Sequence, residues 1–302
     1  MNYFPNNDEE KSLLQFISAY QYLNVNDVKY FFSSKKYYRK RITNLVNKNF
    51  LRRVKLNLVL GKLGIEYIKM FDLYYNKLNR DQRYVPRLLR LSNIGAFYNN
   101  CKNVKFTPSF LIKDKTVFTV TARRFIGILD INGIEYLTYY VGKEHNNKYI
   151  YSVIYDIQKE RQYKNIIIFV DDISKINFNN FAFGLNQVLI IEDTENNRNN
   201  LKYLNNVNWF NIVRKFYKNQ CLSEYNFCEY TNYKDKYITT FFFVDTEKIN
   251  RIKNFLRENK NRNVDIICNI QIKDIIKNNL PNANYIFVNL DEYIDKEINY
   301  YD

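Results

Sequence analysis

Residues 33–48, SSKKYYRKRITNLVNK, carry the pattern that decides the fold of the first third of the chain. Serine is a preferred helix N-cap, so we expect a helix that begins after Ser33 or Ser34 and runs to about Lys48. The side chains expected to be buried recur at i, i+4, i+7 and i+8 and are Tyr38, Ile42, Leu45 and Val46. Those that share another face are Lys36, Arg39, Lys40 and Thr43. The stretch therefore predicts an amphipathic helix with a basic, hydroxylic outer face.

The sequence on both sides of this helix predicts a small mixed domain. Asp8 is placed to cap a first helix whose apolar residues run from Leu13 to Tyr20, and Asn24 or Asn26 opens a brief second helix through Val28 to Phe32. Two short β-prone runs follow, at 50–55 and 58–60, around a turn at Leu56-Asn57, and then 60–68 begins another helix. The order of three helices, two strands and a helix is that of a winged helix-turn-helix domain.

A short helix, a turn and a longer basic helix suit insertion into the major groove of double-stranded DNA. We expect phosphate contacts from Lys35, Lys36, Arg39, Lys40, Arg52, Arg53 and Lys55, and base contacts from Tyr37, Thr43 and Asn44. Three alternatives remain open. A basic helix is often only a solvated face, some winged helices bind protein, and Gly61-x-x-Gly64 has the spacing of a KH loop.

The basic charge lies in one segment of the chain. The formal net charge of the 302 residues is +15, and residues 29–90 contain 17 Lys or Arg against 3 Asp or Glu. Residues 105–302 are nearly neutral, with 27 basic and 24 acidic side chains. A general excess of lysine does not produce this asymmetry, so the charge indicates a local anionic partner.

The rare residue types exclude several classes of protein. His145 is the only histidine, so the two-histidine metal site of DNA-nicking relaxases is impossible. The four cysteines form no C-x-x-C pair, which argues against a zinc site, and we expect no cofactor and no metal. Unpaired thiols, no signal peptide and no apolar run near 18 residues predict a cytoplasmic protein without membrane contact.

We expect three regions: a winged-helix domain over 1–78, including a helix from 72 to about 78; a helical connector over 79–104; and an α/β domain over 105–302. The connector has arginines at intervals of three to four, Arg80, Arg83, Arg87 and Arg90, and a helix at Pro86–Asn99. We favour a linker helix packed on both domains, and an arginine ridge that follows the DNA backbone is the alternative. After 105, strand-like runs occur at 110–112, 116–121, 125–129, 136–141, 166–170, 188–191, 238–244, 264–268 and 285–288. Helix patterns occur at 147–161, 197–204, 246–258 and 271–278. This alternation predicts one mixed sheet with helices on its faces, and therefore a two-domain protein of combined α+β and α/β class.

Carboxylates follow several of these strands, at Asp171-Asp172, Glu192-Asp193, Asp245 and Asp291-Glu292. At strand ends such groups either hold a metal ion or cap the next helix, and we favour capping. No phosphate-binding loop, dinucleotide fingerprint or nucleophile elbow occurs in the chain.

Two longer runs extend this interpretation to a family. The runs FIGILDINGIEYLTYYV (125–141) and NIIIFVDD (165–172), placed after a winged helix and a connector, resemble the replication-relaxation proteins of plasmids and mobile elements. The resemblance covers about 8–200 and implies a second domain related to restriction-endonuclease-like folds. Nuclease-competent versions carry a Pro-Asp and then an acid-x-Lys or acid-x-acid. This chain has Pro108-Ser109 and Tyr139-Tyr140-Val141, which favours a scaffold without catalytic residues.

The sequence therefore predicts a sequence-specific, double-stranded-DNA-binding protein of a plasmid or mobile element, acting in replication initiation or maintenance rather than as an enzyme. The α/β domain is expected to form a homodimer or to recruit host replication proteins. Two alternatives stay open, a metal-dependent endonuclease and a winged-helix transcriptional regulator.

Overall fold

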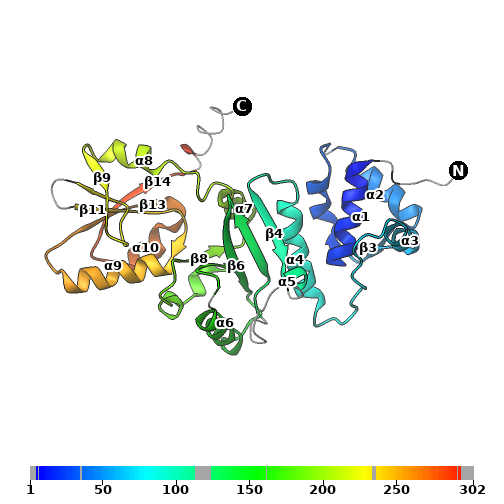
Figure 1. The fold of residues 1–302 in the computed structure, drawn as a ribbon, viewed down its shortest axis with the longest axis horizontal. Coiled ribbons are helices and arrows are strands. Elements are labelled where there is room, and N and C mark those ends of the chain that lie inside the picture. The colour runs from blue at the N-terminus through cyan, green and yellow to red at the C-terminus, as the bar shows by residue number, and fades with distance from the viewer. Residues whose placement is uncertain are drawn as a thin grey trace. The chain divides into compact units, whose positions relative to one another are not determined.

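The computed structural model describes residues 5, 7–34, 36–112, 124–160, 162–232, 236–290 and 292–293 (Figure 1). It has a mixed α/β architecture with three sheets and divides into two compact units, Met1–Asp114 and Lys115–Asp302. Each unit is described by itself. The elements of the first unit are α1 (Asp8–Tyr20), β1 (Leu23–Asn24), the 3-10 helix η1 (Val25–Phe31), α2 (Tyr38–Asn47), β2 (Leu51–Val54), β3 (Asn57–Leu60), α3 (Lys62–Met70), α4 (Val85–Tyr98), β4 (Val104–Pro108) and α5 (Ser109–Ile112).

A three-stranded antiparallel sheet in the order β1-β3-β2 lies beside the helices of the first unit. β2 and β3 form a hairpin in which Val54 lies opposite Asn57, so the turn residues are Lys55 and Leu56. Lys55 adopts a left-handed backbone with φ of 56°. The buried core joins α1, η1, α2, β3 and α3 through Leu13, Ile17, Val28, Leu45, Leu58 and Ile68.

Gly64 allows α3 to approach the sheet closely. A Cβ added there would lie 2.1 Å from the Phe50 carbonyl oxygen, a distance no side chain tolerates. The run LGKLGIEYI therefore needs glycine at this position because helix and backbone are in direct contact.

Three sequence-based expectations in the first unit are wrong in detail. α2 begins at Tyr38 rather than after Ser33, because the Ser33 backbone N–H and hydroxyl donate to the Glu9 carboxylate instead of capping the helix. The helix expected from 72 to about 78 does not form: α3 ends at Met70, and the chain that follows is held by the Asn76 backbone N–H, which donates to the Ser18 carbonyl. The strand expected at 110–112 is helix α5, where the Phe110 ring packs against Tyr20 in an edge contact at 5.5 Å. The expected strand 116–121 lies outside the described residues.

The second unit contains two sheets rather than the single mixed sheet expected. In one, β12, β8, β7, β6 and β5 follow in that order, with β6, β7 and β8 parallel. In the other the order is β14-β13-β11-β10-β9, with β11, β13 and β14 parallel. The expected strand at 238–244 is divided, since β11 ends at Phe241 and β12 pairs with β8 in the other sheet.

The elements of the second unit are β5 (Gly127–Ile131), β6 (Ile134–Val141), α6 (Asn147–Lys159), β7 (Asn165–Val170), η2 (Ile173–Lys175), η3 (Phe178–Phe181), β8 (Gln187–Glu192), α7 (Glu195–Leu201), α8 (Trp209–Phe216), β9 (Gln220–Leu222), β10 (Tyr230–Asn232), β11 (Lys236–Phe241), β12 (Val244–Asp245), α9 (Thr246–Glu258), β13 (Val264–Asn269), η4 (Ile270–Ile272), α10 (Lys273–Asn279) and β14 (Asn284–Val288). The expected helix at 246–258 is confirmed at both ends.

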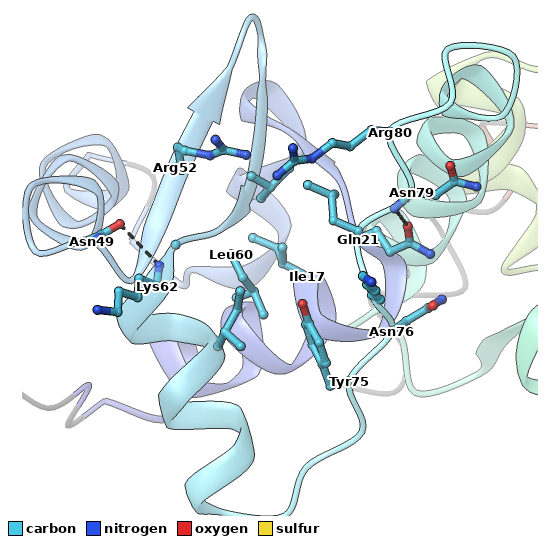
Figure 2. Close-up of a pocket in the computed structure, with 15 residues that line it drawn as sticks. Ile17, Gln21, Asn49, Arg52, Leu60, Lys62, Tyr75, Asn76, Asn79 and Arg80 are labelled. Carbon is cyan, nitrogen blue, oxygen red and sulfur yellow. Dashed lines mark hydrogen bonds between the residues drawn. The ribbon is translucent and has the colours of Figure 1, made fainter.

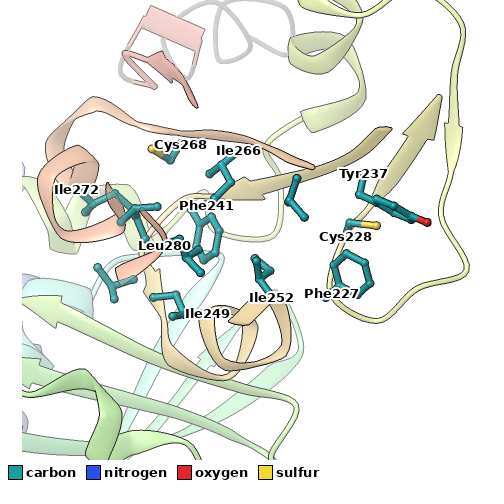
Figure 3. Close-up of a cluster of buried hydrophobic side chains, with 13 residues drawn as sticks. Phe227, Cys228, Tyr237, Phe241, Ile249, Ile252, Ile266, Cys268, Ile272 and Leu280 are labelled. Atoms are coloured by element: carbon teal, nitrogen blue, oxygen red, sulfur yellow. The ribbon is translucent and has the colours of Figure 1, made fainter. Parts of the chain in front are cut away.

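The second sheet of this unit has its own apolar core. Figure 3 shows Ile249 and Ile252 of α9 beneath Phe241 and Ile266 of the strands. All four side chains are almost fully buried. The cluster also includes Val244 of β12, so this core continues to the strand that pairs with β8 in the other sheet.

Candidate nucleic-acid interface

Helix α2 is fixed against the rest of the first unit by apolar and ionic contacts. Ile42 and Leu45 are fully buried, while Tyr38 and Val46 are half-buried, so the expected stripe faces inward. Arg41 also faces inward: its guanidinium forms ion pairs with Glu9 and Glu10 of α1 and lies over the Phe32 ring at 4.6 Å. These contacts set the rotation of α2 about its axis and thereby determine which side chains face water.

The outward face of α2 carries the residues expected to contact DNA. The exposed side chains are Arg39, Lys40, Thr43 and Asn44 of α2, together with Lys36 and Tyr37, which immediately precede it. Tyr37 is 66% exposed, so its ring and hydroxyl are accessible to a ligand. The Thr43 hydroxyl donates to the Arg39 carbonyl at 3.0 Å, so it is free to act as an acceptor. Lys35 lies outside the described residues.

The hairpin adds a second group of exposed cations. Arg52, Arg53 and Lys55 are exposed, and Arg52 lies opposite Val59 whereas Arg53 lies opposite Leu58. Because neighbouring residues of a strand point to opposite faces, the two arginines project from opposite sides of the hairpin. The backbone N–H of Val25 donates to the Leu56 carbonyl at 3.0 Å and holds the hairpin turn in place.

These cations have no acidic partner in the part of the chain that the structure describes. Among the described residues, six cationic side chains take part in no ion pair: Lys36, Arg39, Lys40, Arg52, Arg53 and Lys55. Exposed cations that are not neutralised by neighbouring carboxylates attract polyanions.

The arginines of 80–90 do not form a continuous free surface. Arg83 pairs with Asp81 at 2.7 Å, and Arg87 donates to the Ser109 hydroxyl at 3.3 Å. Arg90 is half-buried. Arg80 alone of the four is exposed without an ion pair among the described residues.

Four of the strand-end carboxylates, those of Asp171, Asp172, Asp193 and Asp245, are engaged in local structure. Asp172 caps η2, and Asp245 caps α9 by accepting from the backbone N–H groups of Glu247 and Lys248. Asp193 binds Arg198 through two hydrogen bonds, and it is Thr194 that caps α7.

Asp171 accepts hydrogen bonds from the Tyr140 hydroxyl and the Lys143 backbone N–H.

Burial also affects the carboxyl group of Asp245, because it raises the pKa of that group above its ordinary value. Across the described ranges, no three His, Cys, Asp or Glu side chains are grouped as a metal site would require. Asp291 lies outside those ranges.

Comparisons with protein-family models, with curated proteins and with solved structures found no match. Among the described helices, none combines the length and apolar character that spanning a bilayer requires.

Proposed function

We propose that the first unit is a winged helix-turn-helix domain and that the protein binds double-stranded DNA in a sequence-specific manner. In this proposal α2 is the recognition helix, η1 is the helix that precedes it, and the β2–β3 hairpin is the wing. The observation that carries the proposal is the group of six exposed cations on α2 and the hairpin that lack acidic partners among the described residues.

The positions of the side chains along α2 support different roles for its cationic and its neutral polar residues. Lys36, Arg39 and Lys40 stand at its N-terminal end, where a helix that enters the major groove approaches the DNA. Thr43 and Asn44 follow one turn later and present hydroxyl and amide groups, which can recognise base edges. The hairpin cations are then available to the flanking phosphates.

The cellular role remains an expectation from the sequence. We propose that the protein belongs to a plasmid or other mobile element and acts in replication initiation or maintenance, with the second unit serving dimerisation or the recruitment of host replication proteins. The resemblance of 8–200 to replication-relaxation proteins supports this role.

The proposal is tested by recovering and sequencing DNA fragments that bind the purified full-length chain. We expect enrichment of one sequence motif, and its loss in the variant Arg39→Ala with Lys40→Ala. A matched control with the same change in charge is Lys102→Ala with Lys105→Ala, because both lysines are exposed and lie outside α2 and the hairpin. Equal enrichment by both double variants would contradict the assignment of α2.

The same preparation tests the endonuclease alternative. Supercoiled DNA with Mg²⁺ or Mn²⁺ should remain intact, because Asp171 accepts two hydrogen bonds, Asp172 and Asp245 cap helices and Asp193 pairs with Arg198. Cleavage that disappears in Asp171→Asn would show the protein to be a nuclease.

A further inference from the structure

A groove of about 830 Å³ lies in the first unit and was not expected from the sequence. Its walls are the C-terminal half of α1, the β2–β3 hairpin, the start of α3 and the chain segment 75–80 that follows (Figure 2). The volume is in the range of sites for small ligands.

The charge of the groove is entirely positive. Its cationic residues are Arg52, Lys62, Lys77 and Arg80, and no Asp or Glu is among the residues that line it. Figure 2 shows the guanidinium groups of Arg52 and Arg80 pointing toward one another from opposite walls, while the Lys62 side chain points away. Two guanidinium groups that face each other repel unless an anion lies between them, and a phosphate accepts hydrogen bonds from both.

The remaining lining suits an organic ring. Apolar contact comes from Ile17, Val59, Leu60, Ile65 and Leu78. Tyr75 directs its hydroxyl toward the middle of the groove, where no described residue binds it. Gln21, Asn49 and Asn79 also line the space. Their amide oxygens accept backbone hydrogen bonds from Asn79, Lys62 and Asp81, so the group that Gln21 offers to the edge of a heterocycle is its NH2, as a donor.

The wall formed by 75–80 is fixed before any ligand arrives. The Asn79 backbone N–H donates to Gln21 Oε1 at 2.6 Å, and the Tyr22 hydroxyl donates to the Asn79 carbonyl at 2.8 Å. Asn76 donates its backbone N–H to the Ser18 carbonyl at 3.0 Å. A groove held open by hydrogen bonds loses little conformational entropy on binding.

We propose that this groove binds a nucleotide, with its phosphate between Arg52 and Arg80 and its base against the apolar wall. Because Arg52 also belongs to the hairpin cations, a bound phosphate neutralises one DNA contact and weakens DNA binding. This effect on DNA rests on the proposed function, whereas nucleotide binding itself does not.

Isothermal titration calorimetry of the full-length chain with AMP tests the proposal, with adenosine and inorganic phosphate as separate probes. We expect saturable AMP binding, weaker binding of either part alone, and at least a tenfold loss of AMP affinity in Arg80→Ala. The matched control is Arg53→Ala, on the same hairpin but not part of the groove lining, which should retain AMP affinity and lose DNA affinity.

The possible outcomes separate this proposal from the preceding one. AMP binding without any DNA binding would leave the nucleotide site standing and remove the proposed function. No saturable AMP binding, or AMP binding unchanged in Arg80→Ala, would overturn the nucleotide site. A third outcome is that AMP does not bind and Arg80→Ala weakens DNA binding as much as Arg53→Ala does. The groove would then hold a phosphodiester of DNA, and the proposed nucleotide site would again be overturned.

Discussion

The Arg41 side chain of α2 binds the Glu10 carboxylate of α1, with Nε 3.0 Å from Oε1. The Glu10 side chain is only 6% exposed, so Arg41 supplies a hydrogen-bond donor to a carboxylate that is largely removed from water. Arg39 and Lys40, which immediately precede Arg41, remain exposed. One arginine of a basic run therefore positions the helix, and its neighbours are left for a ligand.

We predict that Arg41→Ala lowers the free energy of unfolding by about 2–3 kcal/mol, because a nearly buried carboxylate loses charged hydrogen bonds. Urea denaturation followed by circular dichroism measures the change. Arg39→Ala is the control and should lie within about 0.5 kcal/mol of the parent, since Arg39 is exposed. Equal stability of the two variants would show that the ion pairs do not hold α2.

Gly64→Ala should destabilise the first unit by about 1–3 kcal/mol, because the added methyl group meets the Phe50 carbonyl and forces α3 away from the sheet. Thermal unfolding measures this loss. Lys62→Ala in the same helix is the control, as its side chain is exposed and alanine favours helix. A Gly64→Ala variant as stable as the parent would contradict the close contact.

Glu9 makes part of the stability depend on pH. The hydrogen bond from the Ser33 backbone N–H is the largest cause that lowers the pKa of Glu9 below its ordinary 4.5, and Arg41 acts in the same direction. The stabilisation is therefore complete above pH 4.5 and is lost as the pH falls through the lowered pKa. Glu9→Gln should reduce stability at pH 7 and flatten this acid dependence.

Urea titrations at several pH values between 7 and 3 measure the effect of Glu9. The control is Glu258→Gln, a change of an exposed carboxylate at the end of α9. If Glu9→Gln and the parent lose stability in parallel on acidification, the Ser33 contact is not the cause.

The four thiols should differ in reactivity. Burial raises the pKa of Cys228 to about 11 and that of Cys268 to about 12, whereas Cys221 is exposed. At pH 8 roughly one Cys228 side chain in a thousand is a thiolate, so reaction with a disulfide reagent should be slow. Mass mapping after brief labelling should find Cys221 modified, and Cys228 and Cys268 modified only after unfolding. Rapid native labelling of Cys268 would contradict its burial.

Local sequence patterns identified the elements whose contacts are local. The apolar spacing in 38–46 correctly predicts the buried side of α2, and the Asp245-Thr246 pair correctly predicts the start of α9. The sequence predicts too early a start for α2 because Ser33 is held by Glu9, 24 residues away. Such distant partners leave no mark on local periodicity.

Contacts between residues distant in sequence also explain the features of the candidate site that the sequence does not predict. Arg41 is as basic as its neighbours in sequence, and only the position of Glu9 and Glu10 removes it from the exposed set. The sequence does not predict the groove either, because the groove depends on hydrogen bonds that bring Asn76 and Asn79 back to the C-terminal end of α1. The division of the second unit into two sheets required knowledge that β12 pairs with β8.

The central claim, DNA binding through α2 and the hairpin, is tested most directly by the salt dependence of binding to a fluorescent duplex. If about six phosphates are neutralised, affinity should fall roughly a thousandfold between 50 and 200 mM salt. Arg39→Ala with Lys40→Ala should reduce the slope of log affinity against log salt by about 2, while Lys102→Ala with Lys105→Ala leaves it unchanged. A parent protein whose affinity does not change with salt, or a slope that the α2 variant does not alter, would contradict the claim.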